Sequence, residues 1–316
     1  GGGRGAIRSA LSLQMVKDNG AMKRPASALG HNRAVLRANV VKRPASAAVK
    51  GNLRAKRGGA SNAKAARETV HLIDALPYFF RAYYALPAAI KDPAGRQANG
   101  VVGFANFLLK YVADEAPTHM ALCWDRSLTS SFRNALYPPY KANRPLPPAE
   151  LAHQIQRSRA LTEALGIACF DDEKYEADDL LATLAEELVS SGQRCTVVSS
   201  DKDLCQVVGP SVVLHDYAKG ERYDAKGVRS RLGVRPEQVP DFLGLAGDAV
   251  DNIPGVKGLG PKTAVALLAK FKDIEAIFSG LKRVEKLPLR GAAGVAARLS
   301  EHRDVAFLSK KLATVA

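Results

Sequence analysis

The chain has 316 residues, of which 47% are hydrophobic and 24% charged, so it can bury one sizeable core or two modest ones. Apolar stretches stay short of the roughly 18 residues needed to cross a bilayer, and no charged-then-apolar leader precedes the body, which argues against membrane insertion and secretion. The four cysteines form no CxxC pair and the six histidines are scattered, so we expect reduced cysteines and no zinc site.

The net charge of +15 is concentrated in the first 67 residues, which hold 15 of the 46 Lys and Arg residues and a single acid, Asp18. This tail is rich in Gly, Ala and Ser and repeats Lys-Arg-Pro-Ala-Ser-Ala at 23–28 and 42–47. It has too few apolar residues to fold, so we predict disorder. Its composition fits import into a plastid, a mitochondrion or the nucleus, or contact with DNA, and the sequence does not separate these.

From Thr69 onward, short apolar runs alternate with helical segments, the pattern of a mostly parallel central sheet flanked by helices. We predict buried strands at 70–73, 119–124, 167–170 and 195–199, with an amphipathic helix at 177–189. A basic, Pro-rich stretch at 133–144 and a helix reaching residue 164 come between the second and third strands. After Pro236 the pattern is helical, so we expect an α/β domain over 68–235 and a helical subdomain over 236–316.

Acidic residues follow the predicted strands, beginning with Asp74 and Asp125 after the first two. Because ligands of open parallel sheets bind beyond the carboxyl ends of the strands, these acids are expected at one site. The full set is Asp74, Asp125, Glu176, Asp178, Asp179, Asp201, Asp203, Asp248 and Asp251. Each one alone is more simply explained as a turn, cap or helix-dipole residue.

Nine carboxylates at one sheet edge would repel one another unless cations neutralise them. Ligand sets made only of oxygen favour Mg²⁺, for which Mn²⁺ can substitute. Two such ions about 4 Å apart can activate a water molecule and stabilise the leaving oxygen of an in-line displacement. The acids therefore predict nuclease or phosphatase chemistry.

A glycine-rich segment precedes a helix predicted at 265–271, and it contains Gly255, Lys257, Gly258, Gly260, Lys262 and Thr263. Its glycines permit a tight hairpin with backbone N–H groups aimed at an anion. A P-loop is disfavoured because Pro261 separates Gly260 from Lys262, and a dinucleotide fingerprint is disfavoured because Thr263 takes the place of its third glycine.

Basic and aromatic residues interleave between 132 and 144, and they include Arg133, Tyr140, Lys141 and Arg144. This mixture suits stacking and charge contacts with a single nucleic-acid strand, although a solvated loop with incidental aromatics would look the same. Beside an acidic site, such a cationic segment would attract a polyanion that the acids repel.

With these motifs in view, residues 69–316 resemble the 5′-nuclease family, specifically the 5′→3′ exonuclease domain of bacterial-type DNA polymerase I, which is related to the flap endonucleases. The most specific matches are at 175–179, 201–203 and 247–256. The resemblance implies a PIN/resolvase-like fold with a helical arch near 126–164 and a C-terminal helix-hairpin-helix. It also implies two metal groups, the first with Asp74, Asp125, Glu176, Asp178 and Asp179, the second with Asp201, Asp203, Asp248 and Asp251.

The resemblance further implies that Arg81, Lys141 and Arg144 act near the scissile phosphate, and that the hairpin holds duplex DNA with a K⁺ ion. The chain departs from the family pattern at 75–77, at Ser200 and at Ser130, where a lysine is common. These departures remove no metal ligand.

The sequence thus predicts a monomeric, Mg²⁺-dependent 5′→3′ exonuclease or flap endonuclease that acts in primer removal or repair. Its expected substrate is DNA with a 5′ flap, a nick or a 5′ end, with an RNA–DNA hybrid as a second substrate and a DNA polymerase as partner in cis or in trans. Two alternatives remain. A non-catalytic binder of branched DNA would tolerate lost carboxylates, and a phosphohydrolase of small substrates would not need the arch or the hairpin.

Overall fold

The computed structural model describes residues 69–127, 131–145 and 147–316. The predicted basic tail, with its expected role in import or DNA contact, lies outside the described residues, as does Ser130. No helix within the described ranges is both long enough and apolar enough to cross a bilayer.

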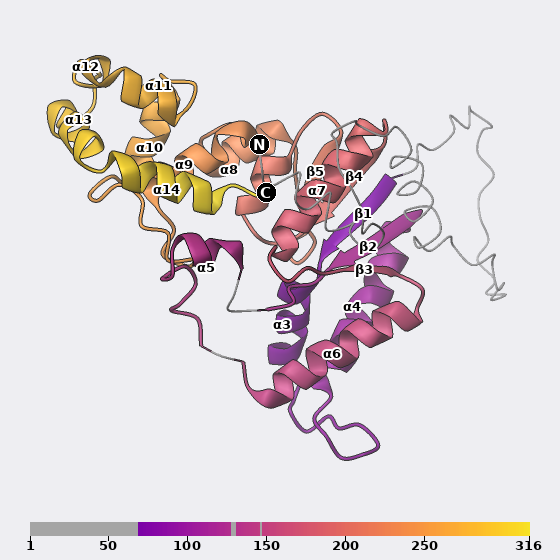
Figure 1. Ribbon diagram of the computed structural model, residues 1–316. Coiled ribbons are helices and arrows are strands. Elements are labelled where there is room, and N and C mark those ends of the chain that lie inside the picture. Colours follow the sequence, from indigo (N-terminus) through magenta and orange to yellow (C-terminus); the bar gives the residue numbers. More distant parts are fainter. Residues whose placement is uncertain (1–68, 128–130, 146) are drawn as a thin grey trace, which may run out of the picture.

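The centre of the molecule is a six-stranded sheet in the order β3-β2-β1-β4-β5-β6 (Figure 1). The strands are β1 (Thr69–Asp74), β2 (His119–Cys123), β3 (Ala168–Phe170), β4 (Arg194–Val198), β5 (Val212–Asp216) and β6 (Glu221–Tyr223). All neighbouring pairs are parallel except β5 and β6, which are antiparallel. The mostly parallel sheet is confirmed, whereas the two strands after β4 were not predicted.

Helices cover both faces of the sheet because apolar side chains on both faces of β1 are buried. Ile73 packs in an aromatic-rich core with α3 (Ala75–Ala85) and α4 (Asn99–Glu115), while Leu72 packs on the opposite face with α7 (Ala177–Ser190). The predicted helix at 177–189 is confirmed to within one residue. All four cysteines are free thiols, as expected, and three of them are buried.

The region expected to form an arch contains α5 (Phe132–Leu136) and α6 (Ala149–Ala164). Helix α6 packs against α4, where the buried Gln154 side chain accepts a hydrogen bond from the Gly100 N–H group at 2.7 Å. The segment between α5 and α6 instead docks on the second half of the chain, because the Asn252 side chain donates to the Pro139 carbonyl at 2.7 Å. The described part of this region is thus anchored at both ends.

From Pro236 onward the chain is helical, as predicted. The helices after β4 are η1 (Asp203–Val207), α8 (Ala225–Leu232), η2 (Pro236–Gln238), α9 (Val239–Ala246), α10 (Pro261–Leu268), α11 (Ile274–Ser279), α12 (Leu281–Val284), α13 (Ala292–Glu301) and α14 (Arg303–Ala313), of which η1 and α8 precede Pro236. Helix α14 packs along α9 and leads the chain back toward α7 (Figure 1).

The helix after the glycine-rich segment begins at Pro261, four residues earlier than predicted, and ends at Leu268. Gly260 occupies the N-cap position, and the fixed φ of proline suits the first helical position, where its missing N–H is not needed. Lys262 and Thr263 consequently lie in the first turn of α10 and not in the preceding loop.

Candidate functional site

Four predicted acids gather at the carboxyl edge of the sheet. Asp74 ends β1, Asp125 follows β2, Asp201 follows β4, and Asp178 lies in the first turn of α7. They meet because β1 lies between β2 and β4 in parallel register, which places the three strand ends side by side.

Hydrogen bonds fix the orientation of these acids. The Ser199 hydroxyl donates to Asp74 Oδ2 at 2.7 Å and accepts from the Asp201 N–H group at 3.0 Å. The Ala177 N–H group, at the start of α7, donates to Asp125 Oδ1 at 2.8 Å. Asp74 and Asp201 are therefore joined through one side chain, although they lie on different strands.

The carboxylates are close enough to perturb one another. Burial, and then the charge of Asp125, raise the pKa of Asp74 to about 8. Burial likewise raises the pKa of Asp125 to about 6, with the Glu176 charge adding to the effect. Burial, followed by the charges of Asp201 and Asp74, raises the pKa of Asp178 well above its ordinary value. A bound cation would offset both effects, because its positive charge stabilises the ionised carboxylates.

A cavity of about 290 Å³ opens beside this group, and it is lined by Asp201, Asp203, Asp248 and Asp251 together with Lys202, Arg144 and Arg231. Burial and the Asp201 charge raise the pKa of Asp203 to about 8. Its buried Oδ1 atom accepts no hydrogen bond from the described residues. The nearest cation, Lys202 Nζ, lies 3.8 Å from this atom, beyond hydrogen-bond distance. A buried carboxylate oxygen without a hydrogen-bond donor is a suitable ligand for a metal ion.

Basic side chains occupy several of the predicted ligand oxygens. Lys141 Nζ lies 3.0 Å from Glu176 Oε1, and Arg144 Nη2 lies 2.5 Å from Asp251 Oδ1. Lys202 Nζ lies 2.5 Å from Asp248 Oδ2. As the side chains stand, the described residues contain no cluster of three or more Asp, Glu, His or Cys residues arranged to hold a metal ion.

The donor chemistry nevertheless fits a hard divalent cation. The group offers carboxylate oxygens only, its members repel one another, and the present counter-ions are side chains of lysine and arginine that can rotate away. Asp74, Asp125, Asp178, Asp201 and Asp203 are the residues best placed to hold such an ion.

Arg133 was predicted to contact DNA, but the structure contradicts this. The side chain is 3% exposed and forms a bidentate pair with Asp179, with Nη2 2.7 Å from Oδ1 and Nη1 2.8 Å from Oδ2. Asp179 Oδ2 also accepts from the Glu176 N–H group at 3.0 Å. Asp179, predicted as a metal ligand, is completely buried and already has partners on both oxygens, so we reassign this pair to holding the start of α7 in place.

Tyr140 was also predicted to contact DNA, and it too is buried, which leaves its ring unavailable for stacking on a base. Its hydroxyl donates to Glu176 Oε2 at 3.0 Å and lies 3.4 Å from Asp251 Oδ2. The tyrosine hydroxyl therefore contacts one carboxylate from each of the two predicted metal groups. Lys141 and Arg144, by contrast, point toward the carboxylates, and Arg144 is 42% exposed.

Arg81, predicted near the scissile phosphate, is exposed on α3. It lines a second cavity of about 120 Å³ with Lys219, and this cavity shares Pro77 and Ser200 with the larger one. Pro77 and Ser200 thus lie between the cavity of Arg81 and the cavity of the acids.

The predicted glycine-rich residues form the loop between α9 and α10. Gly255 and Gly258 have φ values of +62° and +76°, which side chains rarely adopt. Lys257 in the loop and Lys262 in the first turn of α10 are exposed, whereas Gly255 is buried. This loop presents backbone and cationic side chains together, and its contact with a phosphate stays a prediction.

Three residues of the site, Ser199, Lys202 and Arg231, were not predicted. Ser199, the first residue after β4, joins Asp74 to Asp201, and its position beside an acidic strand end was the available signal. Arg231 reaches the acidic cavity from α8, and its buried Nη1 atom has no hydrogen-bond partner within the described part of the chain. No local pattern marks it, because the approach of α8 to the cavity is a tertiary feature.

The fold and site define a protein in which a resolvase-like α/β domain with an acidic sheet edge is joined to a helical domain. The family profile described as "5'-3' exonuclease, N-terminal resolvase-like domain" matches residues 69–233, and that described as "5'-3' exonuclease, C-terminal SAM fold" matches residues 234–316. The chain belongs to the 5′-3′ exonuclease family, and the resemblance seen in its motifs is confirmed.

Curated relatives agree with this assignment. DNA polymerase I of Pseudomonas aeruginosa is 39% identical over 245 residues, covering 77% of this chain and 27% of the polymerase. DNA polymerase I of Bacillus subtilis is 38% identical over 253 residues, covering 79% of this chain and 28% of the polymerase. The chain spans about a quarter of the length of the curated relatives it matches.

Two solved structures of bacteriophage T5 proteins share the fold. One is the T5 5′-exonuclease with bound divalent zinc, with a TM-score of 0.62 and 19% identity over 78% of this chain and 89% of that chain. The other is a T5 flap endonuclease variant in a pseudo-enzyme–product complex with DNA and metal ions, with a TM-score of 0.63 and 20% identity over 78% and 89%.

Proposed function

We propose that this chain hydrolyses phosphodiester bonds of DNA at or near a 5′ end, with Mg²⁺ held by the acidic residues at the sheet edge. The observation that carries the proposal is the convergence of Asp74, Asp125, Asp178 and Asp201, where burial and then the neighbouring carboxylates raise the pKa of Asp74 and Asp178. A divalent cation bound there would supply an activated water and stabilise the leaving oxygen. Mn²⁺, similar in ligand preference, is expected to replace Mg²⁺.

The basic residues around the cavity would orient the scissile phosphate. Arg144 and Arg231 line the cavity, and Lys141 and Lys202 would be released from their carboxylates when metal ions neutralise them. Ammonium and guanidinium groups placed near the developing charge stabilise it more strongly in a partly buried site than in water. Arg81 would act on the same strand from the neighbouring cavity.

The loop at 255–260 and the first turn of α10 would hold the duplex beside the cut. Exposed Lys257 and Lys262 flank the N-terminus of α10, where Thr263 lies, so phosphate oxygens would meet both charge and backbone N–H groups. We extend the proposal to a K⁺ ion bound by the carbonyl groups of this loop.

The substrates would be a 5′ flap, a nick or a recessed 5′ end, with RNA–DNA hybrids as a second class. Support comes from the relatives, which are DNA polymerases, and from the structural neighbour solved with DNA and metal ions. We propose that the chain serves primer removal or repair together with a DNA polymerase in cis or in trans, and that its basic tail directs it to the compartment where this takes place.

The experiment is incubation with an end-labelled 5′-flap duplex and its single-stranded control, each with Mg²⁺ and with EDTA. We expect cleavage near the flap junction only with Mg²⁺. Tight binding of the flap without cleavage would favour the non-catalytic binder, and hydrolysis of small phosphoesters without DNA cleavage would favour the phosphohydrolase.

A further inference from the structure

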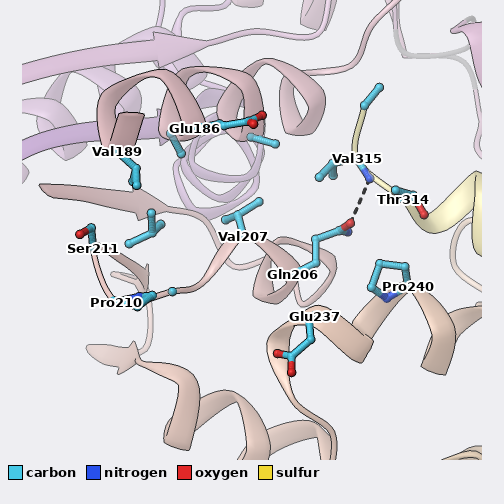
Figure 2. A pocket seen from close by; sticks show the side chains of 15 residues that line it. Glu186, Val189, Gln206, Val207, Pro210, Ser211, Glu237, Pro240, Thr314 and Val315 are labelled. Atoms are coloured by element: carbon cyan, nitrogen blue, oxygen red, sulfur yellow. Dashed lines mark hydrogen bonds between the residues drawn. The ribbon is translucent and has the colours of Figure 1, made fainter. Parts of the chain in front are cut away.

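The last described residues, 312–316, begin in the final turn of α14 and lie against α5, α7 and η1 at one end of a cavity of about 450 Å³. Figure 2 shows Val315 beside Gln206, joined by a hydrogen bond, with Val207 and Pro240 nearby. The contacts to this segment are made to its backbone by side chains from other elements. Backbone contacts fix where a segment lies whatever its own side chains are.

Arg133 makes the first set of contacts. Its Nε atom donates to the Leu312 carbonyl at 2.7 Å and Nη2 donates to the Thr314 carbonyl at 3.0 Å. The other donors reach Asp179, at 2.7 and 2.8 Å, and Glu176 Oε2, at 3.1 Å. A guanidinium group has five N–H donors, so all of them are used.

Asp179 contacts the same segment, because its Oδ1 atom accepts a hydrogen bond from the Ala316 N–H group at 2.8 Å. The pair Arg133–Asp179 therefore joins the 312–316 segment to the first turn of α7. That turn carries Asp178 and is preceded by Glu176, so it contributes carboxylates to the first acidic group.

Gln206 makes the second set from η1. Its Nε2 atom donates to the Ala313 carbonyl at 3.0 Å and to the Asp203 carbonyl at 2.8 Å, while its Oε1 atom accepts from the Val315 N–H group at 3.0 Å. The one amide thus ties the segment to Asp203, whose Oδ1 atom lacks a hydrogen-bond donor in the described chain.

We propose that the 312–316 segment positions the acidic site, holding α7 through Arg133 and η1 through Gln206 so that Glu176, Asp178 and Asp203 keep their spacing. This proposal rests on the proposed function, since it assigns the acids to metal binding. Arg133, Asp179 and Gln206 are positioning residues, because they touch the backbone and carboxylates and not the reacting phosphate. Partners that orient metal ligands typically contribute about 10- to 100-fold in metal affinity.

The test uses the full chain and its Gln206→Leu variant, which keeps the side-chain volume and loses all three hydrogen bonds. Ca²⁺ and Mg²⁺ binding are measured by titration calorimetry, and cleavage of a 5′-flap duplex is measured at several DNA concentrations. We expect metal affinity and kcat to fall by about tenfold or more with KM for DNA unchanged, because the loop at 255–260 is untouched. Glu237→Gln is the matched control, since Glu237 lines the same cavity but pairs with Arg235.

A lower melting temperature for Gln206→Leu, with metal affinity and kcat within twofold of wild type, would show a merely structural role and overturn the proposal. A measurement on the unmodified chain is independent of any variant. Because coupling is reciprocal, Ca²⁺ should slow amide hydrogen exchange at Val315 and Ala316 but not in α11. Unchanged exchange at a saturating Ca²⁺ concentration would also overturn it.

The two proposals fail in distinguishable ways. Absence of Mg²⁺-dependent DNA cleavage by the wild type would remove the proposed function. The calorimetry and the exchange measurement would still decide whether the 312–316 segment positions a metal site, because neither depends on DNA.

Discussion

Lys141 Nζ and Glu176 Oε1 lie 3.0 Å apart, and only 12% and 11% of these side chains are exposed. Burial opposes the charged form of Lys141, but the neighbouring acids, Glu176 first among them, together outweigh burial and raise the pKa of the ammonium group. The backbone supports this placement, because Lys141 has a φ of +53° and its N–H group donates to the Asp251 carbonyl at 3.0 Å. The lysine is therefore a built-in counter-ion of the acidic site.

Replacing Lys141 by Met should separate its two roles. Removing an electrostatic donor from a partly buried site is expected to slow DNA cleavage by about 10²- to 10³-fold. Ca²⁺ should bind more tightly, because Glu176 loses a competing cation. Single-turnover cleavage and calorimetry measure the two effects, with Lys286→Met, an exposed lysine beyond α12, as control. Weaker Ca²⁺ binding in Lys141→Met would contradict the counter-ion role.

Asp201→Ala should abolish cleavage while leaving DNA binding intact. Asp201 lines the acidic cavity, and its charge is the largest cause after burial that raises the pKa of both Asp178 and Asp203, so its carboxylate is shared by the two acidic groups. A bound metal ion lowers the activation free energy by several kcal/mol, so its loss should slow cleavage by about 10³-fold or more. Fluorescence anisotropy with a labelled flap in Ca²⁺ reports binding. Asp304→Ala, an exposed acid on α14, is the control, and full activity of Asp201→Ala would refute the metal assignment.

The metal-free protein should lose stability as the pH rises from 6.5 to 8. Asp74 and Asp203 have pKa values raised to about 8 from an ordinary 3.8, so in this window the folded state binds more protons than the unfolded state and unfolding becomes easier. His71, with its pKa lowered to about 4, affects stability only below its ordinary value of 6.5. Melting temperatures in EDTA measure the slope, which saturating Mg²⁺ should flatten. If the melting temperature of the metal-free protein rises with pH in this window, the raised pKa values of Asp74 and Asp203 are contradicted.

Gly255→Ala should destabilise the α9–α10 loop, and Gly260→Ala should not. Gly255 has a φ of +62°, and a Cβ atom there would lie 2.3 Å from the Gly247 nitrogen. Such a clash with backbone costs about 2–4 kcal/mol and should weaken DNA binding in parallel. At Gly260 a Cβ atom meets nothing within 4 Å and φ is −87°. Denaturant unfolding and flap binding of both variants check this, and equal stabilities would show that the loop adapts.

The α/β domain and its acids were predictable because the signal is local. A short apolar run followed by an acid identified β1, β2 and β4 with Asp74, Asp125 and Asp201, and the parallel pattern alone placed them at one edge. Strand β6 was missed because it is a charged, exposed edge strand of three residues, whereas β5, an apolar run of five residues that ends in Asp216, carried the same local signal and was overlooked.

The roles of Arg133 and Tyr140 were wrong for a different reason. In the sequence both belong to a basic, aromatic stretch typical of nucleic-acid contacts. Their burial depends on Asp179, Glu176 and Leu312, which lie up to 179 residues away along the chain. The residues next to Arg133 and Tyr140 in the sequence carry no information on partners so far away along the chain.

The two edge strands of the sheet limit contacts between copies of this chain. Strands β3 and β6, the outermost in the order, have three residues each, so the sheet offers few unpaired N–H and C=O groups to a strand from another molecule. Copies of the chain that lie close together on one long polymer would therefore have few free edge groups for the strand pairing that leads to aggregation.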